Sequence, residues 1–380
     1  MVIMKLSWLL FPAAAVALTP IHSKTSSPAS ELGRRDVFGL GVGGLATALW
    51  APAAATAADV VVTQDALLAA AAAAPVKRKI IVTGANSGVG LEGAKLLAAA
   101  GHEVVCACRT AAKADAAAAA CGHGAVGAVC DLADLASVRA FAASVTSVDV
   151  LVNNAGLALN TKDATPQRTK DGFEMTIGTN HLGHFLLYEA LEAKLARSKA
   201  PRLVVTASPV HDPKSGGGDV GSPAGLGDLS GLKDRNFAMC DGSSYDADKA
   251  YKDSKLCNIL FAAEAARRLE EKNPKATVNA FSPGLIPSPD GFFKYQNKFF
   301  AKTFSTIATA AGVAETPQFG GACLAYMAAA TELDGVSGAW YDTDPPGKHQ
   351  LRAHDPSAEA RDVDKQRKLW ALSEALVGKA

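Results

Sequence analysis

Tyr251 and Lys255 are the two residues whose types and spacing best suit acid–base chemistry. Four residues make about one helical turn, so the two side chains share one face of a helix. A phenol has a pKa near ~10 and exchanges protons poorly at neutral pH. An ammonium within ~4–6 Å favours the phenolate and lowers that pKa. The pair therefore predicts a tuned proton-transfer group.

A glycine-rich segment suits the binding of a dinucleotide. It follows an apolar strand pattern over 79–83 and precedes the helical periodicity of Leu91, Ala94 and Leu97. Glycines let the backbone turn sharply beside a pyrophosphate, and the helix start offers unpaired N–H groups to the anion. The cofactor contacts expected here come from Gly84, Asn86, Ser87, Gly88, Val89 and Gly90.

The end of the second predicted strand, 103–109, indicates which dinucleotide binds. A site specific for NAD usually has an acidic residue there, which binds the ribose 2′-hydroxyl. This chain has Arg109, with Lys113 one turn later, and both suit a 2′-phosphate. The sequence therefore favours NADPH, although a solvated basic helix start is the alternative explanation. Asp131 and Leu132, after a third strand over 126–130, are placed to contact the adenine.

Further motifs follow in an order that resembles the short-chain dehydrogenase/reductase family. A strand over 148–152 precedes Asn153-Asn154-Ala155-Gly156, a helix is expected over 173–185, and strands over 203–206 and 278–282 follow. The resemblance implies one α/β domain, a Rossmann-type doubly wound parallel sheet. It also implies cofactor contacts from Asn154, Ala155 and Gly156, which line the cleft, and from Pro283 and Gly284, which lie beside the nicotinamide. Tyr251 and Lys255 are expected to contact the cofactor as well, and Lys255 would hold its nicotinamide ribose. Asn180 is expected to kink its helix and hold a water of the proton relay, and Ser208 to contact the substrate or Tyr251.

The spacing between Ser208 and Tyr251 narrows the resemblance. The two are 43 residues apart (251 − 208), about thirty more than is usual in the family, which predicts an insertion over 209–248. This insertion, the run 250–258 and the tail 362–374 resemble light-dependent protochlorophyllide oxidoreductases. The resemblance spans roughly 77–378. It implies that NADPH reduces photoexcited protochlorophyllide, a tetrapyrrole pigment, with Tyr251 as proton donor.

Several positions depart from that family's pattern on the substrate side. Leu285 stands where the family has a cysteine, Ile286-Pro287-Ser288-Pro289 replaces its threonine pair, and Pro209-Val210-His211 replaces a Thr/Gly-rich turn. A dark NADPH-dependent reductase of a plastid carbonyl or retinoid-like substrate is therefore the alternative. A non-catalytic pigment- or NADPH-binding protein is the third reading. Phenylalanines over 292–304 predict a helical lid, or else core packing.

Composition and the N-terminal region bound the remaining possibilities. The formal net charge of +1 over 380 residues gives no field that would attract nucleic acid. The seven cysteines, an odd number, are expected to be reduced thiols in the core. His181 and His184 have no third ligand nearby in the sequence, so we expect no metal site there. We expect a signal peptide over 1–23, a plastid transit and second hydrophobic targeting segment over 24–57, an Ala-rich linker over 58–76 and the reductase domain over 77–380.

This leader predicts a plastid protein. We expect the stroma or the thylakoid surface because NADPH is stromal. Arg34-Arg35 resembles the start of a twin-arginine export signal, so delivery to the lumen is the alternative. Peripheral membrane contact and a homo-oligomer are both compatible with the sequence.

Overall fold

The structure, a computed structural model, describes residues 61–73, 76–287, 298–343 and 345–378, and for 298–301 it describes the backbone alone. The predicted targeting segments over 1–57 lie outside the described residues. So do Ser288, Pro289 and the first phenylalanines of the predicted lid.

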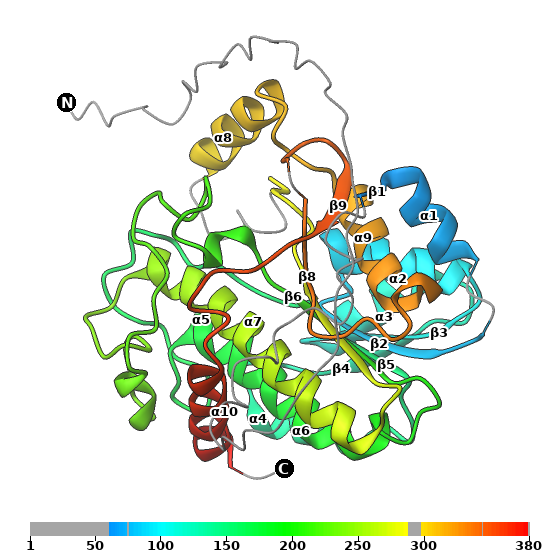
Figure 1. The fold of residues 1–380 in the computed structure, drawn as a ribbon, viewed down its shortest axis with the longest axis horizontal. Helices are drawn as coiled ribbons and strands as arrows, with labels where there is room; N and C mark the ends of the chain where they lie inside the picture. The colour runs from blue at the N-terminus through cyan, green and yellow to red at the C-terminus, as the bar shows by residue number, and fades with distance from the viewer. Residues whose placement is uncertain (1–60, 74–75, 288–297, 344, 379–380) are drawn as a thin grey trace, which may run out of the picture. The chain divides into compact units, whose positions relative to one another are not determined.

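One sheet forms the centre of the domain (Figure 1). In the described residues its strands lie in the order β1-β9-β8-β7-β6-β5-β2-β3-β4. Strands β2 to β8 pair in parallel, while β9 and β1 are antiparallel at one edge. The strand bounds are β1 Val61–Thr63, β2 Lys79–Thr83, β3 Glu103–Cys108, β4 Val126–Val129, β5 Val150–Asn153, β6 Arg202–Thr206, β7 Thr277–Phe281, β8 Trp340–Asp342 and β9 Gln350–Ala353.

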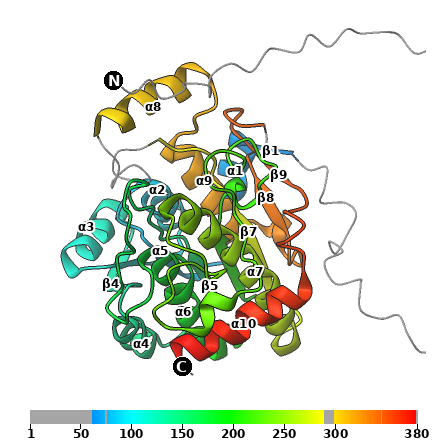
Figure 2. The ribbon, with the colours of Figure 1, turned by 90° about the vertical axis from the view of Figure 1, so that its left-hand side faces the viewer.

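Helices cover both faces of this sheet, and each layer has its own apolar core (Figures 1 and 2). One core is formed under α1 (Gln64–Ala72), α2 (Gly88–Ala99), α3 (Ala111–Cys121) and α9 (Pro317–Ala329). The other lies under α4 (Leu135–Ser144), α6 (Gly183–Leu195), α7 (Ala247–Lys272) and α10 (Val363–Val377). Because both faces are buried, strand β2 is apolar on both sides, which explains its continuous Ile80-Ile81-Val82 run.

The predicted Rossmann-type fold is confirmed. All six predicted strands occur, with ends within two residues of those expected. The order reverses between β2 and β5, and in open α/β sheets ligands bind at such a switch point, outside the carboxyl ends of the strands. The glycine-rich segment leaves β2 at that point.

The prediction of an Ala-rich linker over 58–76 is wrong for its described part. Strand β1 pairs with β9, with Val62 opposite Leu351. Helix α1 then buries Leu67 and Ala71 in the core shared with α9. The folded domain therefore includes residues from Val61 onward.

Two helix predictions need correction. The helix expected over 173–185 begins at Met175 as α5 (Met175–Ile177), widens into a π-helical turn η1 (Gly178–Leu182) and continues as α6. The helix expected to open at Tyr251 begins at Ala247, because Asp246 caps it by accepting from the amides of Asp248 and Lys249. Tyr251 therefore lies one turn inside α7.

The insertion 209–248 is folded despite its Gly/Ser/Asp-rich composition. It contains two short 3₁₀ turns, η2 (Pro209–His211) and η3 (Ser230–Lys233). It buries a set of apolar side chains: Leu226, Leu229, Leu232, Met239 and Cys240. Helix α8 (Lys298–Ala310), within the segment predicted as a lid, stands apart from the helical layers in both views (Figures 1 and 2). Among the described helices, none combines the length and apolarity needed to cross a membrane.

Candidate active site

The glycine-rich segment forms a tight turn against the strand that follows it in the sheet. Gly84 and Gly88 have φ values of +67° and +53°, a region that L side chains rarely adopt. A Cβ on Gly90 would lie 2.5 Å from both Asn154 Nδ2 and Gly84 O, so only glycine fits there. The N-cap of α2, Ser87, makes no side-chain cap, which leaves the first amides of the helix to an anion.

The motif after β5 is bonded to the end of β2. Asn154 Nδ2 donates to Thr83 O at 2.9 Å. The amides of Asn154 and Ala155 both donate to Thr83 Oγ1, at 2.9 and 3.0 Å. Together with the close contact between Gly84 and Ala155, these bonds fix the two predicted cofactor motifs as one unit.

The predicted adenine end presents two exposed or half-buried cations. Arg109 follows β3 and is exposed, and Lys113 lies half-buried in the first turn of α3. Asp131 follows β4 closely and accepts from the amide of Ala133 at 3.1 Å, while Leu132 is buried against Gly183 at the start of α6. Leu132 thus belongs partly to the core.

Tyr251 and Lys255 lie together, as their spacing predicts. Lys255 Nζ is 5.4 Å from the centroid of the Tyr251 ring. Lys255 is only 4 % exposed, and burial lowers its pKa to about 8. Among the described residues no carboxylate pairs with it. The expectation of a lowered pKa for Tyr251 is wrong, because burial raises the pKa of Tyr251.

Asn180 occupies the π-helical turn and faces the same place. Its Oδ1 accepts from Leu157 N at 2.9 Å, and its Nδ2 donates to Leu157 O at 2.9 Å and Ser254 Oγ at 3.0 Å. Both amide hydrogens are therefore used within the protein. A Cβ on Gly156 would lie 3.5 Å from both Asn180 Oδ1 and Lys255 Nζ, so these three residues converge.

Ser208 caps the turn that begins the insertion. Its hydroxyl accepts from Val210 N at 3.5 Å. Its carbonyl accepts from His211 Nδ1 at 2.8 Å, and the other ring nitrogen of His211 accepts from Ser357 N at 3.1 Å. The buried His211, whose pKa is lowered by burial, thus fastens the Ser208 turn to the C-terminal segment. The sequence identifies His211 only as part of a departure from a family pattern, because its partner Ser357 lies far along the chain.

The Pro283-Gly284-Leu285 loop is supported by a glutamate that sequence reasoning missed. Gly284 has a φ of +83°, and a Cβ there would lie 2.5 Å from Glu315 Cγ. Glu315 N donates to Leu285 O at 2.7 Å. The buried Glu315 carboxylate accepts from Gly347 N at 2.9 Å and contacts the ring of His349. An acidic residue within an apolar segment was the available signal, but nothing local named its partners.

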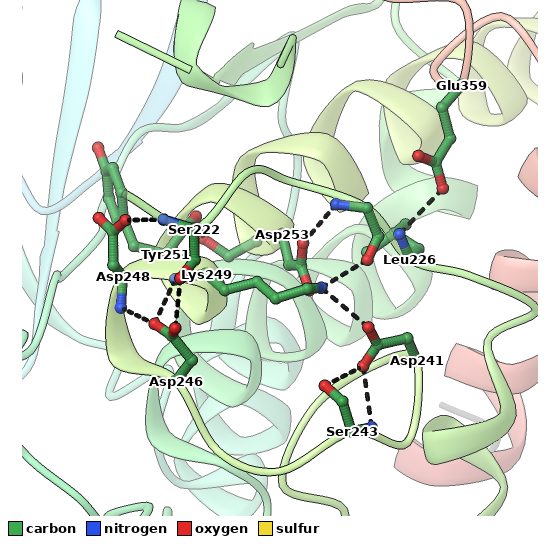
Figure 3. A network of polar contacts seen from close by, with 12 residues as sticks. Ser222, Leu226, Asp241, Ser243, Asp246, Asp248, Lys249, Tyr251, Asp253 and Glu359 are labelled. Carbon is green, nitrogen blue, oxygen red and sulfur yellow. Dashed lines mark hydrogen bonds and ion pairs between the residues drawn. The ribbon is translucent and has the colours of Figure 1, made fainter. Parts of the chain in front are cut away.

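The insertion is anchored to the catalytic helix by a buried ion pair (Figure 3). Lys249 Nζ lies 2.6 Å from Asp253 Oδ2 and 3.2 Å from Asp241 Oδ2, and it donates to Gly225 O at 2.6 Å. Asp253 Oδ1 accepts from Gly225 N at 2.9 Å. Tyr251 leaves the same helix in another direction (Figure 3), so one face of α7 carries Tyr251 and another holds the insertion.

The described residues fit a dinucleotide and offer no cluster of ligands for a metal ion. The glycine turn, the uncapped α2 start and the unpaired Lys255 are the features that a phosphate and a ribose would occupy. All seven cysteines are buried and free, as expected of core thiols.

The parallel sheet with its glycine turn and Tyr-Lys pair defines a short-chain dehydrogenase. The family model described as short chain dehydrogenase matches residues 78–218. A solved structure of an uncharacterized protein from Mycobacterium Paratuberculosis superposes with a TM-score of 0.61 and 31% identity, covering 81% of this chain and 97% of that one. A second, titled short chain dehydrogenase/reductase family protein, gives a TM-score of 0.52 at 26% identity, covering 71% and 97%.

Curated relatives make the assignment narrower. The chain is 38% identical to "Protochlorophyllide reductase, chloroplastic" of Pisum sativum, over 80% of this chain and 79% of the relative. It is 40% identical to "Protochlorophyllide reductase A, chloroplastic" of Triticum aestivum, over 79% and 80%. The chain belongs to the protochlorophyllide reductase family of short-chain dehydrogenases. It is an oxidoreductase that uses a nicotinamide cofactor.

Proposed function

We propose that this protein is an NADPH-dependent protochlorophyllide reductase driven by light, with Tyr251 as its proton donor. The observation that carries the proposal is the pairing of the half-buried Tyr251 with the buried Lys255, beside Asn180 and Gly156. The names of the relatives, which match about 80% of the chain, support the substrate class, a tetrapyrrole pigment.

Within this proposal, the bound nicotinamide supplies a hydride to one carbon of the substrate double bond. Tyr251 Oη–H gives a proton to the neighbouring carbon. The raised pKa of Tyr251 suits this role, because a proton donor must hold its proton at neutral pH. Lys255 stabilises the phenolate left behind, since its ammonium lies beside the ring with no carboxylate to neutralise it.

We propose NADPH rather than NADH; two cations that suit a 2′-phosphate support this, the exposed Arg109 after β3 and Lys113 in the first turn of α3. We further propose that Asn86, Ser87, Val89, Asn154 and Ala155 line the cofactor cleft, with Pro283 and Gly284 beside the carboxamide. Ser208, at the entrance to the insertion, would contact substrate or Tyr251.

The relatives' names place them in the chloroplast, and we propose a plastid location for this protein too. A stromal or thylakoid-surface position would give it access to NADPH. Contact with the membrane surface and formation of a homo-oligomer remain proposals of the same kind.

Leu285 favours a second candidate function. Its backbone is held by Glu315, but its side chain can neither donate a proton nor bond a pigment carboxylate. A dark NADPH-dependent reductase of a plastid carbonyl or retinoid-like substrate would tolerate an apolar group at this position.

A flash experiment separates the two. Purified protein is mixed with NADPH and protochlorophyllide in darkness, and absorbance is recorded before and after one brief flash. A flash-dependent shift to the chlorophyllide spectrum is expected. No shift, with NADPH still bound, would reject the light-driven reaction in favour of a dark reductase.

A further inference from the structure

His184 lies at the middle of a buried hydrogen-bonded chain that runs between the cofactor motifs and the catalytic helix. Its Nε2 is 2.8 Å from Thr83 Oγ1, at the end of β2. Its Nδ1 is 3.0 Å from the main-chain oxygen of Asn180. The chain continues from Asn180 Nδ2 to Ser254 Oγ at 3.0 Å, and from there to the Tyr251 carbonyl at 2.6 Å.

The hydrogens in this chain can be assigned by counting donors and acceptors. Asn180 O can only accept, so His184 Nδ1 carries a hydrogen. The two lone pairs of Thr83 Oγ1 are taken by the amides of Asn154 and Ala155. The single Thr83 hydroxyl hydrogen then points to the nearer acceptor, His184 Nε2, rather than to Val152 O at 3.2 Å.

This assignment requires a neutral ring. A hydrogen on Nε2 would meet a hydroxyl oxygen whose lone pairs are both occupied, and it would have no acceptor. The surroundings agree, because burial and then the nearby Lys255 charge lower the pKa of His184 to about 4. Lys255 on α7 and His181 on η1 are the titratable groups that interact with it in the structure.

The backbone around Asn180 explains why such a bond is needed. In the π-helical turn, Gly183 N bonds to Gly178 O, five residues back, so the α-helical pattern is interrupted there. Side chains therefore hold the turn against the sheet, Asn180 through Leu157 and His184 through Thr83. His184 bonds the Asn180 carbonyl from one side and the end of β2 from the other.

We propose that His184 is a positioning residue that sets the π-helical turn, and through Asn180 and Ser254 the Tyr251 backbone, relative to the NADPH loop. The inference rests on the proposed function, because it concerns how NADPH is positioned relative to Tyr251, the proposed proton donor. It adds a residue that touches neither cofactor nor substrate.

Two substitutions divide the bonds of His184. An asparagine side chain places its amide N–H where His184 Nδ1–H lies. His184→Asn therefore keeps the hydrogen bond to the Asn180 carbonyl and loses the one with Thr83. Gln reaches the Nε2 position, so His184→Gln keeps Thr83 and loses Asn180. His181→Asn is the matched control: His181 is also buried, three residues away on the same helical segment, but it bonds Ser373 of α10.

The two variants should fail in different steps. Because a lost buried hydrogen bond leaves a partner unsatisfied, we expect His184→Asn to weaken NADPH binding about tenfold with conversion at saturating NADPH near normal. We expect His184→Gln to lower conversion about tenfold with NADPH affinity within about twofold. His181→Asn should lower the melting temperature and leave both quantities within about twofold. Equal losses in the two His184 variants, or losses only of stability, would overturn the proposal.

A measurement on the unaltered protein guards against variants that do not fold. Nitrogen-15 NMR of the histidine rings should show a neutral Nδ1–H tautomer for His184 from pH 5 to 9. A charged ring, or a hydrogen on Nε2, would refute the assignment. Failure of the proposed function shows separately, as absence of flash conversion in the wild-type protein, while NADPH affinities and the tautomer still decide the role of His184.

Discussion

The ammonium of Lys255 lies 5.4 Å from the centre of the Tyr251 ring, buried and without a carboxylate partner among the described residues. Burying an unpaired charge is costly, and the lowering of its pKa from 10.5 to about 8 expresses that cost. The arrangement therefore lowers stability and provides a positive field at the Tyr251 phenol.

Replacing Lys255 by Met should stabilise the protein while abolishing turnover. Below pH 8 both the folded and unfolded states carry the charge, so the cost is fully present. Between pH 8 and 10.5 the folded state loses the proton first, and the cost fades as pH rises. We expect Lys255→Met to exceed the wild type by up to roughly 3 kcal/mol at pH 7 and by less at pH 9.5. Urea unfolding at both pH values measures this; a destabilised variant at pH 7 would contradict it.

Removing the phenol should affect the chemistry and spare the cofactor. Tyr251→Phe keeps the ring under Lys255 and deletes only the hydroxyl, so NADPH affinity should change little. Loss of a general acid typically costs about 10²- to 10⁴-fold in rate. Conversion per flash at saturating NADPH is the measurement. An unchanged rate would remove Tyr251 from the mechanism.

Arg109 should determine how much more tightly the protein binds NADPH than NADH. Hydrogen bonds to charged groups contribute about 1.5–3 kcal/mol, so Arg109→Ala should weaken NADPH binding roughly 10- to 150-fold. NADH has no 2′-phosphate, and its affinity should not change. Arg367→Ala, which removes an exposed charge on α10, controls for net charge. A parallel loss for both cofactors would show that Arg109 does not bind the 2′-phosphate.

Local sequence was sufficient for the parallel strands β2 to β7 and for the motifs at their carboxyl ends. A run such as Ile80-Ile81-Val82 followed directly by glycines has few readings other than a buried strand and a turn. The same holds for Tyr251 and Lys255, whose spacing alone places them on one face.

Properties that depend on distant partners were beyond the sequence. Strand β1 escaped notice because its partner, β9, lies almost 300 residues further along the chain. The direction of the shift in the pKa of Tyr251 depends on its burial by the whole fold. The sequence assigns no role to His184 beyond excluding a metal site, and only the structure brings Thr83 to its ring.

The anchor of the insertion can be broken at Asp253. Asp253→Ala removes the nearer of the two carboxylates at Lys249 and leaves Asp241 in place, so it should cost about 1–3 kcal/mol. Gly225 also loses the acceptor for its amide, so protease cleavage should appear within 209–248. Asp228→Ala removes an exposed carboxylate from the same insertion and should change neither property. Equal protease resistance in both variants would show that the insertion is held by its apolar side chains alone.

Restoring the thiol at position 285 tests whether this side of the site limits the light reaction. The Leu285 backbone is fixed by Glu315, so a new side chain should enter without moving the loop. A cysteine can donate a weak hydrogen bond or a proton, which leucine cannot. We expect Leu285→Cys to raise the chlorophyllide formed per flash several-fold. Leu285→Ala provides the same extra room without a thiol, so an equal gain in both variants would mean that space, rather than proton donation, is what the leucine restricts.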